Sequence, residues 1–429
     1  MSTESCFLFL DPRLDPRYQS AVGDMNNPNR RASDIGFFND FTRDYTQMAA
    51  FASVDFDILE NLTLTLGTRY FDIENSMVGA NMGSFYCKVY QEEFGGFNAG
   101  ASGPCQTAFG TNVSEQEDNN NQADGFRSRA NLTWRITGDA LVYATWSEGY
   151  RPGGFNRGSA CGVADPVSGV AQWCFPTSYE SDDLTNYELG WKTAFWGGRA
   201  QFNGAIYEIK WENAQTGLFA PQLGFPNLQS FLTGPEYEVQ GVEFSFVVAP
   251  MDGLVINAAG SYNKAELNNS PQLISNNPDS PTLGQPITES CLDTPFVPAN
   301  GCTNVVSVEN IFGTPGTEMA NAPELQFNIR ARYEWNWNEY SPYVGAAIQY
   351  QDESFSSATA VNRYVQPSWT TMDASVGVGK DAWNAELFVT NLTDENKSVY
   401  TTASQFILTE VPMRPRTIGL RLGYSFGEN

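Results

Sequence analysis

The chain has 429 residues, of which 14% are aromatic and only 17% are charged. Its formal net charge of -25 argues against a nucleic-acid partner, because binding to phosphates needs a basic surface. The chain contains no histidine, which excludes Ser-His-Asp and Cys-His catalysis and His-ligated metal sites. We therefore expect neither an enzyme nor a cofactor.

Alternating apolar and polar residues recur along the whole chain and predict β-strands. Near the C-terminus, for example, Leu325, Phe327 and Ile329 alternate with polar residues. Because strand side chains point to opposite faces with period two, such segments lie between an oily and a wet environment. In chain order, the predicted strands lie near residues 45–58, 61–75, 125–137, 140–151, 183–195, 199–212, 236–250, 253–267, 321–337, 341–355, 369–380, 383–395 and 413–426.

The connections between these strands alternate between short and long. Residues 59–61, 138–139, 196–198, 250–253 and 380–382 are tight turns rich in Gly, Asp and Asn, whereas residues 76–124 and 268–320 are long connections. A soluble β-sandwich or propeller also fits the composition, but loops this long are uncommon in compact soluble domains. No run of eighteen apolar residues exists, so a helical membrane protein is excluded and a strand-built one is not. The pattern predicts an antiparallel transmembrane β-barrel with short periplasmic turns and long extracellular loops.

Six of the seven cysteines fall as close pairs inside the predicted long loops, which predicts three disulfides in an extracytoplasmic protein. The pairs are Cys87 with Cys105, Cys161 with Cys174, and Cys291 with Cys302. The seventh, Cys6, is either free or paired with a residue upstream of Met1. We expect no metal site, because the acidic residues near Glu115 and Asp124 do not match an EF-hand. Asp182 and Asp183 are predicted to be solvated.

Several segments resemble the C-terminal barrel of TonB-dependent outer-membrane receptors, and the resemblance covers most of residues 45–426. Its elements, in order, are NLTLTLGTRY at 61–70, YATWSEGYRPGGFN at 143–156, the hairpin at 186–215, GVE at 241–243, NLTD at 391–394 and RPR at 414–416 before the last strand. The order and spacing of these segments make the resemblance specific.

The resemblance implies a particular organisation. Receptors of this family carry a plug domain and an energy-coupling box before a barrel of twenty-two strands, and neither plug nor box is visible here. We expect residues 1–44 to be an extracellular-loop remnant or an irregular segment, and residues 45–426 to be a partial barrel of about thirteen C-terminal strands. The acidic start of the chain does not match a signal peptide. With an odd strand count, this predicts a truncated gene or a fragment.

The resemblance also implies a function in the bacterial outer membrane, in contact with its lipid. The expected ligand is a small molecule, most often a metal chelate such as a ferric siderophore. Its import would be energised by the TonB complex through the missing plug. The last strand would contact the barrel assembly machinery. A passive diffusion porin or a smaller self-contained barrel is one alternative, and a structural or adhesive surface barrel is another.

Candidate ligand-binding residues are the aromatic residues of the long loops and two arginines beside the signature segment. Aromatic rings offer broad contact at a low entropic cost, and arginines can pair with an anionic chelate. Each ring could instead pack loop against loop, and each arginine could be anchored to a carboxylate. The candidates are Phe85, Tyr86, Tyr90, Tyr150, Arg151, Arg157, Trp173, Phe175, Tyr179, Phe219 and Phe225.

Overall fold

A computed structural model of the chain describes residues 37–83, 120–156, 161–218, 230–293, 301–359, 363–404 and 407–426. Within these residues every regular element is a β-strand. No helix among them is long and apolar enough to cross a membrane. Thirteen of the strands form one sheet in the order β1-β2-β3-β4-β9-β10-β13-β14-β17-β18-β21-β22-β25.

All thirteen strands predicted from the sequence are present in this sheet. They are β1 (Phe37–Leu59), β2 (Leu62–Gly83), β3 (Asn120–Thr137), β4 (Ala140–Arg151), β9 (Asp182–Phe195), β10 (Ala200–Glu212), β13 (Glu236–Met251), β14 (Leu254–Asn269), β17 (Leu325–Glu334), β18 (Ser341–Gln351), β21 (Trp369–Lys380), β22 (Trp383–Thr390) and β25 (Thr417–Tyr424). β1 and β2 extend beyond their predicted ends, and β17 is shorter than expected.

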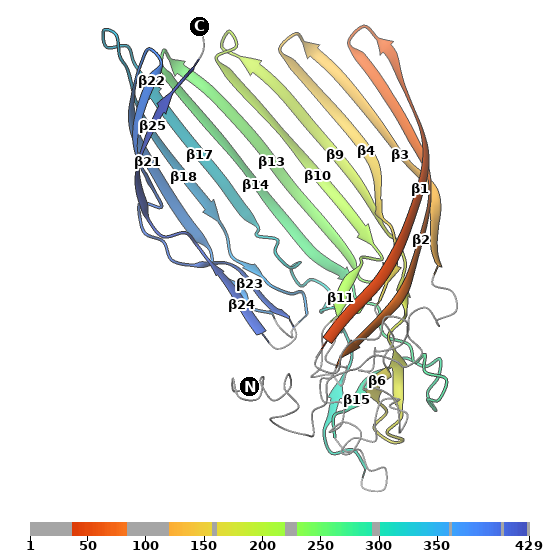
Figure 1. Cartoon of the computed structure of the whole chain (residues 1–429). Helices are drawn as coiled ribbons and strands as arrows, with labels where there is room; N and C mark the ends of the chain where they lie inside the picture. The colour runs from red at the N-terminus through yellow and green to blue at the C-terminus, as the bar shows by residue number, and fades with distance from the viewer. Residues whose placement is uncertain are drawn as a thin grey trace.

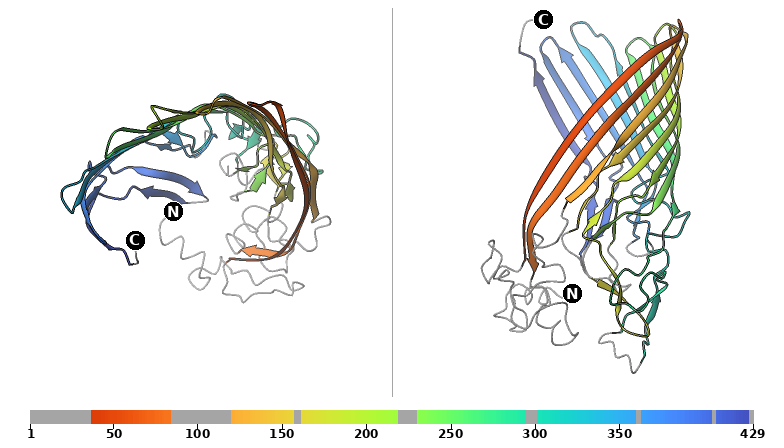
Figure 2. Two further views of the ribbon diagram at one scale, coloured as in Figure 1. Left: turned by 90° about the horizontal axis from the view of Figure 1, so that it is seen from above. Right: turned by 90° about the vertical axis from the view of Figure 1, so that its right-hand side faces the viewer.

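Each strand of the sheet pairs antiparallel with the sheet strand that follows it in the chain. The tight turns therefore gather at one rim, and the long connections gather at the other (Figure 1). Seen along its axis, the sheet curves as an arc with β1 at one edge and β25 at the other (Figure 2). This arrangement separates a convex outer face from a concave inner face.

The outer face is apolar from strand to strand. The register sets Phe56 beside Leu64, Leu64 beside Leu132, and Ala144 beside Leu189. Leu189 in turn is level with Ile206, and these two side chains are 50% and 49% exposed. Leaving a large apolar side chain in water forfeits about 1.5–3 kcal/mol, so a whole face of them requires an apolar surrounding. This face is the one that lipid covers in an outer-membrane barrel.

The inner face is polar, and its side chains hydrogen-bond across the strands. Thr65 Oγ1 donates to Asp55 at 2.6 Å, and Asn131 Nδ2 donates to Thr145 Oγ1 at 2.7 Å. The Tyr143 hydroxyl donates to Glu188 Oε1 at 2.6 Å. The Tyr143 ring reaches this position because it crosses Gly190, where a Cβ would lie 2.3 Å from the ring.

Twelve short strands in the connections were not predicted. They are β5 (Gly154–Phe155), β6 (Cys161–Ala164), β7 (Ala171–Cys174), β8 (Ser178–Tyr179), β11 (Thr216–Leu218), β12 (Ser230–Leu232), β15 (Glu289–Cys291), β16 (Val305–Ser307), β19 (Ser354–Phe355), β20 (Val365–Gln366), β23 (Ser398–Ser404) and β24 (Ile407–Pro412). Most are too short to display a period of two. Each pairs with another short strand of its own connection, and only the bridge from β15 to β6 joins two connections.

Replacing Leu189 on the outer face by arginine should destabilise the protein in lipid bilayers by about 2–4 kcal/mol, because a charge would then face hydrocarbon. Urea unfolding followed by tryptophan fluorescence measures this change. The control is Asn203→Arg on the neighbouring strand β10, whose side chain faces the opposite side of the sheet. Equal destabilisation by the two variants would contradict the assignment of the faces.

Candidate ligand-binding site

Two long connections meet beyond the rim of the main sheet that carries the long connections, and together they form one small sheet. Its strand order is β16-β15-β6-β7, so strands of residues 161–174 pair with strands of residues 289–307. The Cys161–Cys174 and Cys291–Cys302 disulfides both lie in or beside it, which confirms two of the predicted pairs. The third predicted pair, Cys87 with Cys105, lies outside the described residues.

A hydrophobic core fills the space between these connections and residues 213–235. Its members are Val163, Trp173, Phe175, Leu218, Leu232, Leu273, Ile287, Val308, Ile311 and Phe312. Burying this many large apolar side chains provides the connections with a core of their own, separate from the sheet. We call the described parts of residues 152–181, 213–235 and 270–324 the loop assembly.

Trp173 and Phe175, two of the candidate ligand-binding residues, belong to this core. They are 5% and 2% exposed, and their rings meet edge to face at 4.6 Å. A ligand outside the loop assembly would reach little of either ring. The sequence left two roles open for these rings, ligand binding and packing between loops. The geometry favours packing between loops for Trp173 and for Phe175.

Side-chain amides connect strand β7 to residues 270–287. The Cys174 backbone N–H donates to Asn276 Oδ1 at 2.6 Å, and Asn276 Nδ2 donates to the Cys174 carbonyl at 2.9 Å. Nearby, Ser275 Oγ donates to the Gln172 carbonyl at 2.8 Å. Asn276 thus supplies the two hydrogen bonds that a neighbouring strand would supply, so the edge of β7 is satisfied without a strand.

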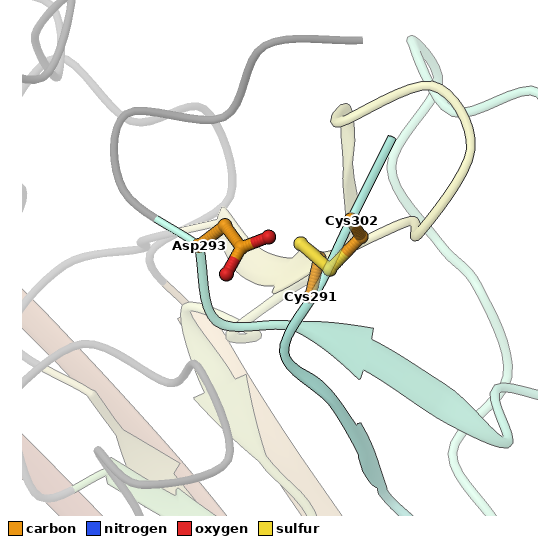
Figure 3. Close-up of side chains that lie close together, drawn as sticks. All are labelled: Cys291, Asp293 and Cys302. Atoms are coloured by element: carbon orange, nitrogen blue, oxygen red, sulfur yellow. A yellow bond between two sulfur atoms is a disulfide. The ribbon is translucent and has the colours of Figure 1, made fainter. Parts of the chain in front are cut away.

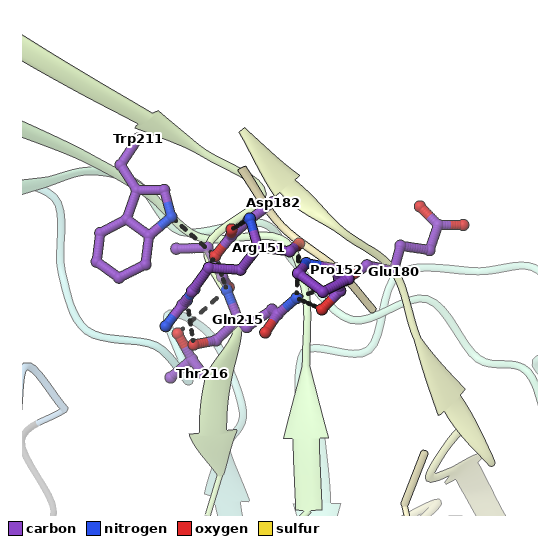
Figure 4. Close-up of polar contacts among 8 residues, drawn as sticks. Arg151, Pro152, Glu180, Asp182, Trp211, Gln215 and Thr216 are labelled. Carbon is purple, nitrogen blue, oxygen red and sulfur yellow. Dashed lines mark hydrogen bonds and ion pairs between the residues drawn. The ribbon is translucent and has the colours of Figure 1, made fainter. Parts of the chain in front are cut away.

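A buried aspartate connects the loop assembly to the sheet (Figure 4). Asp182, at the start of β9, is 1% exposed, so the prediction that it is solvated is wrong. Arg151 at the end of β4 donates to its Oδ2 from Nε at 2.8 Å and from Nη2 at 2.5 Å. Trp211 Nε1 on β10 donates to the same oxygen at 2.9 Å. The carboxylate therefore joins three adjacent strands at the rim, where residues 152 and 213 leave the sheet.

Gln215 extends this network into the loop assembly. Its backbone N–H lies 3.3 Å from Asp182 Oδ2, and its Nε2 donates to the carbonyls of Pro152 at 2.9 Å and Glu180 at 3.0 Å. The guanidinium of Arg151 also lies over the Trp211 ring, 4.6 Å from its centroid. The geometry favours the anchoring role for Arg151 over pairing with a chelate.

Tyr150 and Tyr179 occupy different surroundings. The Tyr150 ring stacks on Phe71 with centroids 3.9 Å apart, and the guanidinium of Arg127 lies 5.0 Å from the Tyr150 centroid. The Tyr179 ring lies 5.6 Å from that of Phe231 in the loop assembly. The remaining candidates, Phe85, Tyr86, Tyr90, Arg157, Phe219 and Phe225, lie outside the described residues.

Cys291, Asp293 and Cys302 converge closely enough to suggest a metal site (Figure 3). The two sulfurs are bonded to each other, so neither is available as a thiolate ligand. The Thr303 backbone N–H donates to Asp293 Oδ2 at 2.5 Å, and this hydrogen bond lowers the pKa of the Asp293 carboxyl. The group is therefore a turn closed by the Cys291–Cys302 disulfide, in which the Asp293 carboxylate accepts a backbone hydrogen bond.

The inner face of the main sheet is hollowed between strands β4 and β14. One hollow of about 650 Å³ includes Glu148, Glu188, Tyr207, Glu243 and Asn263 in its lining. A second hollow, of about 490 Å³, shares Glu243 and continues over β17 and β18. Apart from Tyr150 and Arg151 at the end of β4, the candidates chosen from the sequence belong to the connections and missed this polar wall. The alternation of each strand already separates its inner residues from its outer ones.

A family model described as TonB dependent receptor-like, beta-barrel, matches residues 10–392 of the chain. The fold is also similar to the ferric yersiniabactin uptake receptor FyuA from Yersinia pestis, with 15% identity and a TM-score of 0.59. It is similar to the siderophore receptor PiuA from Acinetobacter baumannii, with 17% identity and a TM-score of 0.58. A third similar structure is the ferric-catecholate import receptor Fiu from E. coli K12, with 15% identity and a TM-score of 0.57. Each match covers 90% of this chain, and 46%, 44% and 45% respectively of the matched chain.

Asp182→Asn should loosen the loop assembly, because it leaves the Arg151 guanidinium without its buried carboxylate. We expect a loss of about 1–3 kcal/mol, below the usual cost of breaking a buried pair because the Arg151 side chain is 49% exposed. Hydrogen exchange at the Gln215 amide measures it. Asp183→Asn is the control, since the Asp183 side chain is 49% exposed and its loss should cost at most about 1 kcal/mol. Equal effects would contradict a special role for Asp182.

Removing the Cys161–Cys174 disulfide by a double serine substitution should destabilise the loop assembly and leave the sheet intact. The two cysteines are 13 residues apart, and closing a loop of this size contributes about 3 kcal/mol. Limited proteolysis should then cleave within residues 161–174 much faster, while heat-induced unfolding of the sheet keeps its midpoint. A lowered midpoint without faster cleavage would contradict this separation.

Proposed function

Because the chain belongs to the TonB-dependent receptor family, we propose that it forms the ligand-binding wall of a receptor that imports a scarce nutrient. Members of the family are outer-membrane transporters of Gram-negative bacteria and not enzymes. In our proposal the nutrient is a metal chelate such as a ferric siderophore, and energy for its import comes through TonB. The whole receptor is the active unit, since the chain spans less than half the length of the solved structures it matches.

The observation that carries this proposal is the packed loop assembly at the rim of the polar inner wall. A passive pore needs an unobstructed mouth, whereas the loop assembly at the rim of the sheet is a packed unit with its own core. A packed cover suits a protein that holds one ligand at a time. The three similar structures are named for uptake of ferric yersiniabactin, a siderophore and ferric catecholate, which supports a chelate as the ligand.

The partners follow from the same proposal. Lipid covers the convex face, whose exposed side chains include Leu189, Ile206 and Leu420. In this proposal TonB acts through the plug domain of the complete receptor. The barrel assembly machinery recognises β25, which lies at an edge of the sheet with Ile418, Leu420 and Leu422 exposed.

The test is uptake of radiolabelled ferric chelates by cells that express the complete receptor gene, compared with cells in which the gene is deleted. We expect deletion to abolish high-affinity uptake of at least one chelate. Collapse of the proton gradient or loss of TonB should reduce that uptake at least as strongly.

Two outcomes would contradict the proposal. Uptake that persists without the proton gradient and rises linearly with ligand concentration would indicate a diffusion pore. Absence of chelate binding, together with loss of surface attachment in the deletion strain, would indicate an adhesive barrel.

A further inference from the structure

The convex, lipid-facing side of the sheet carries a hollow of its own. A groove of about 690 Å³ crosses strands β2, β3, β4, β9, β10 and β13. We call it the lipid-face groove, because its lining includes Leu64, Leu132 and Leu189, which the register places on the outer face. These strands all lie between β1 and β14 in the sheet order, so neither edge of the sheet borders the groove. Strands added at those edges would leave it in place.

Short side chains form the floor of the lipid-face groove. The register sets Ala144 beside Leu132, and it sets Ala130 beside Trp146. Tyr187, the partner of Trp146 on β9, also belongs to the lining. Lipid tails are as apolar as leucine, so association within a membrane depends on van der Waals packing. A recess bordered by large side chains gives one acyl chain more such contacts than a flat surface would.

The lipid-face groove runs obliquely across the outer face, from the rim with the tight turns toward the rim with the long connections. Leu64, at one end, is the third residue of β2 after a tight turn. Gln240, at the other end, is the fifth residue of β13 after a long connection. The long connections are extracellular in an outer-membrane barrel. An acyl chain that follows the groove therefore places its headgroup near Glu208 and Gln240, at the extracellular side.

This extracellular end carries charges of both signs. Glu208 lines the groove, and Lys210 Nζ lies 3.8 Å from Glu208 Oε1. The register also sets Lys210 beside Glu238, whose Oε1 accepts a hydrogen bond from Gln240 Nε2 at 2.7 Å. Two carboxylates thus flank one ammonium group. The side chains of Glu208 and Lys210 are 39% and 52% exposed, so both are within reach of a headgroup.

We propose that the lipid-face groove binds one membrane lipid whose headgroup carries a phosphate and a primary ammonium group. The acyl chain lies over Ala130 and Ala144, the ammonium group contacts Glu208 and Glu238, and the phosphate contacts Lys210. A headgroup with negative charge alone would meet the surplus carboxylate and bind less tightly. Ion pairs between exposed side chains are weak, so the headgroup can replace the contact between Lys210 and Glu208. This inference rests on the outer-membrane location and is independent of the proposed import function.

The experiment counts the lipids that the complete purified receptor retains in native mass spectrometry. The detergent micelles contain equal amounts of phosphatidylethanolamine and phosphatidylglycerol with the same acyl chains. Both probes carry a phosphate, and only phosphatidylethanolamine carries an ammonium group. We expect the receptor to retain one lipid, with a preference of at least about fivefold for phosphatidylethanolamine, because one charge-assisted contact distinguishes the two probes.

A charge variant tests the headgroup contact. Glu208→Gln/Glu238→Gln should reduce the preference to within about twofold, because the ammonium group loses both carboxylates. Asp72→Asn/Glu74→Gln is the matched control. It also removes two carboxylates from the outer face, but on β2 and outside the lining of the groove. The preference should stay unchanged in this control.

A shape variant tests the contact with the acyl chain. Ala130→Leu/Ala144→Leu should lower retention of both probes at least about fivefold, because the larger side chains fill the floor of the groove. Ala346→Leu/Ala374→Leu is the matched control, since these two alanines are neighbours on the outer face of β18 and β21, away from the groove. Retention should stay unchanged in this control.

Each contrary result would overturn a stated part of the inference. Failure of the wild type to retain a lipid, or equal retention after the groove is filled, would overturn the groove as a binding site. Equal retention of the two probes by the wild type, or a preference that survives the loss of both carboxylates, would overturn the assignment of the headgroup. Import of chelates is measured separately in cells, so these results leave the proposed function standing.

Discussion

The constraint on which the structure depends is that no backbone polar group can remain unpaired in hydrocarbon. The antiparallel ladder meets this constraint for the eleven strands between the edge strands β1 and β25, and its register then decides which side chains share a face. Because the period is two, one slip by a single residue would turn Leu64, Leu132 and Leu189 toward the wet side. The lipid-facing surface, the polar wall and the positions of the loops are all consequences of this single register.

The register also explains why the fold was predictable from the sequence and why parts of the site were not. The thirteen strands were predicted because each lies between lipid and water and must alternate. The far ends of β1 and β2 were missed, since beyond the lipid both faces meet water and alternation is no longer required. The disulfide pairs Cys161–Cys174 and Cys291–Cys302 were predictable from spacing alone, because cysteines so close in a loop have few other partners.

The orientation of loop side chains has no comparable signal in the sequence. Trp173 and Phe175 lie inside the loop assembly, and an aromatic residue that faces a ligand would have the same sequence pattern. Asp182 was predicted to be solvated, but it is buried against Arg151 and Trp211. These partners belong to two other strands, so the local sequence does not reveal them. Only the register brings these three residues together. The sign of charge on each part of the inner wall likewise depends on which strands are neighbours.

The shared core of the loop assembly restricts how the outer surface of this protein can change over time. Surface loops of a bacterium are exposed to phage and to antibodies, and isolated loops can diverge one at a time because each tolerates insertion and substitution. Here residues 161–174 share a sheet with residues 289–307, and a third connection contributes Leu218 and Leu232 to the same core. A substitution that reshapes one connection must be accommodated by the other two. Divergence is therefore confined to side chains on the outside of the unit, or it must alter all three connections together.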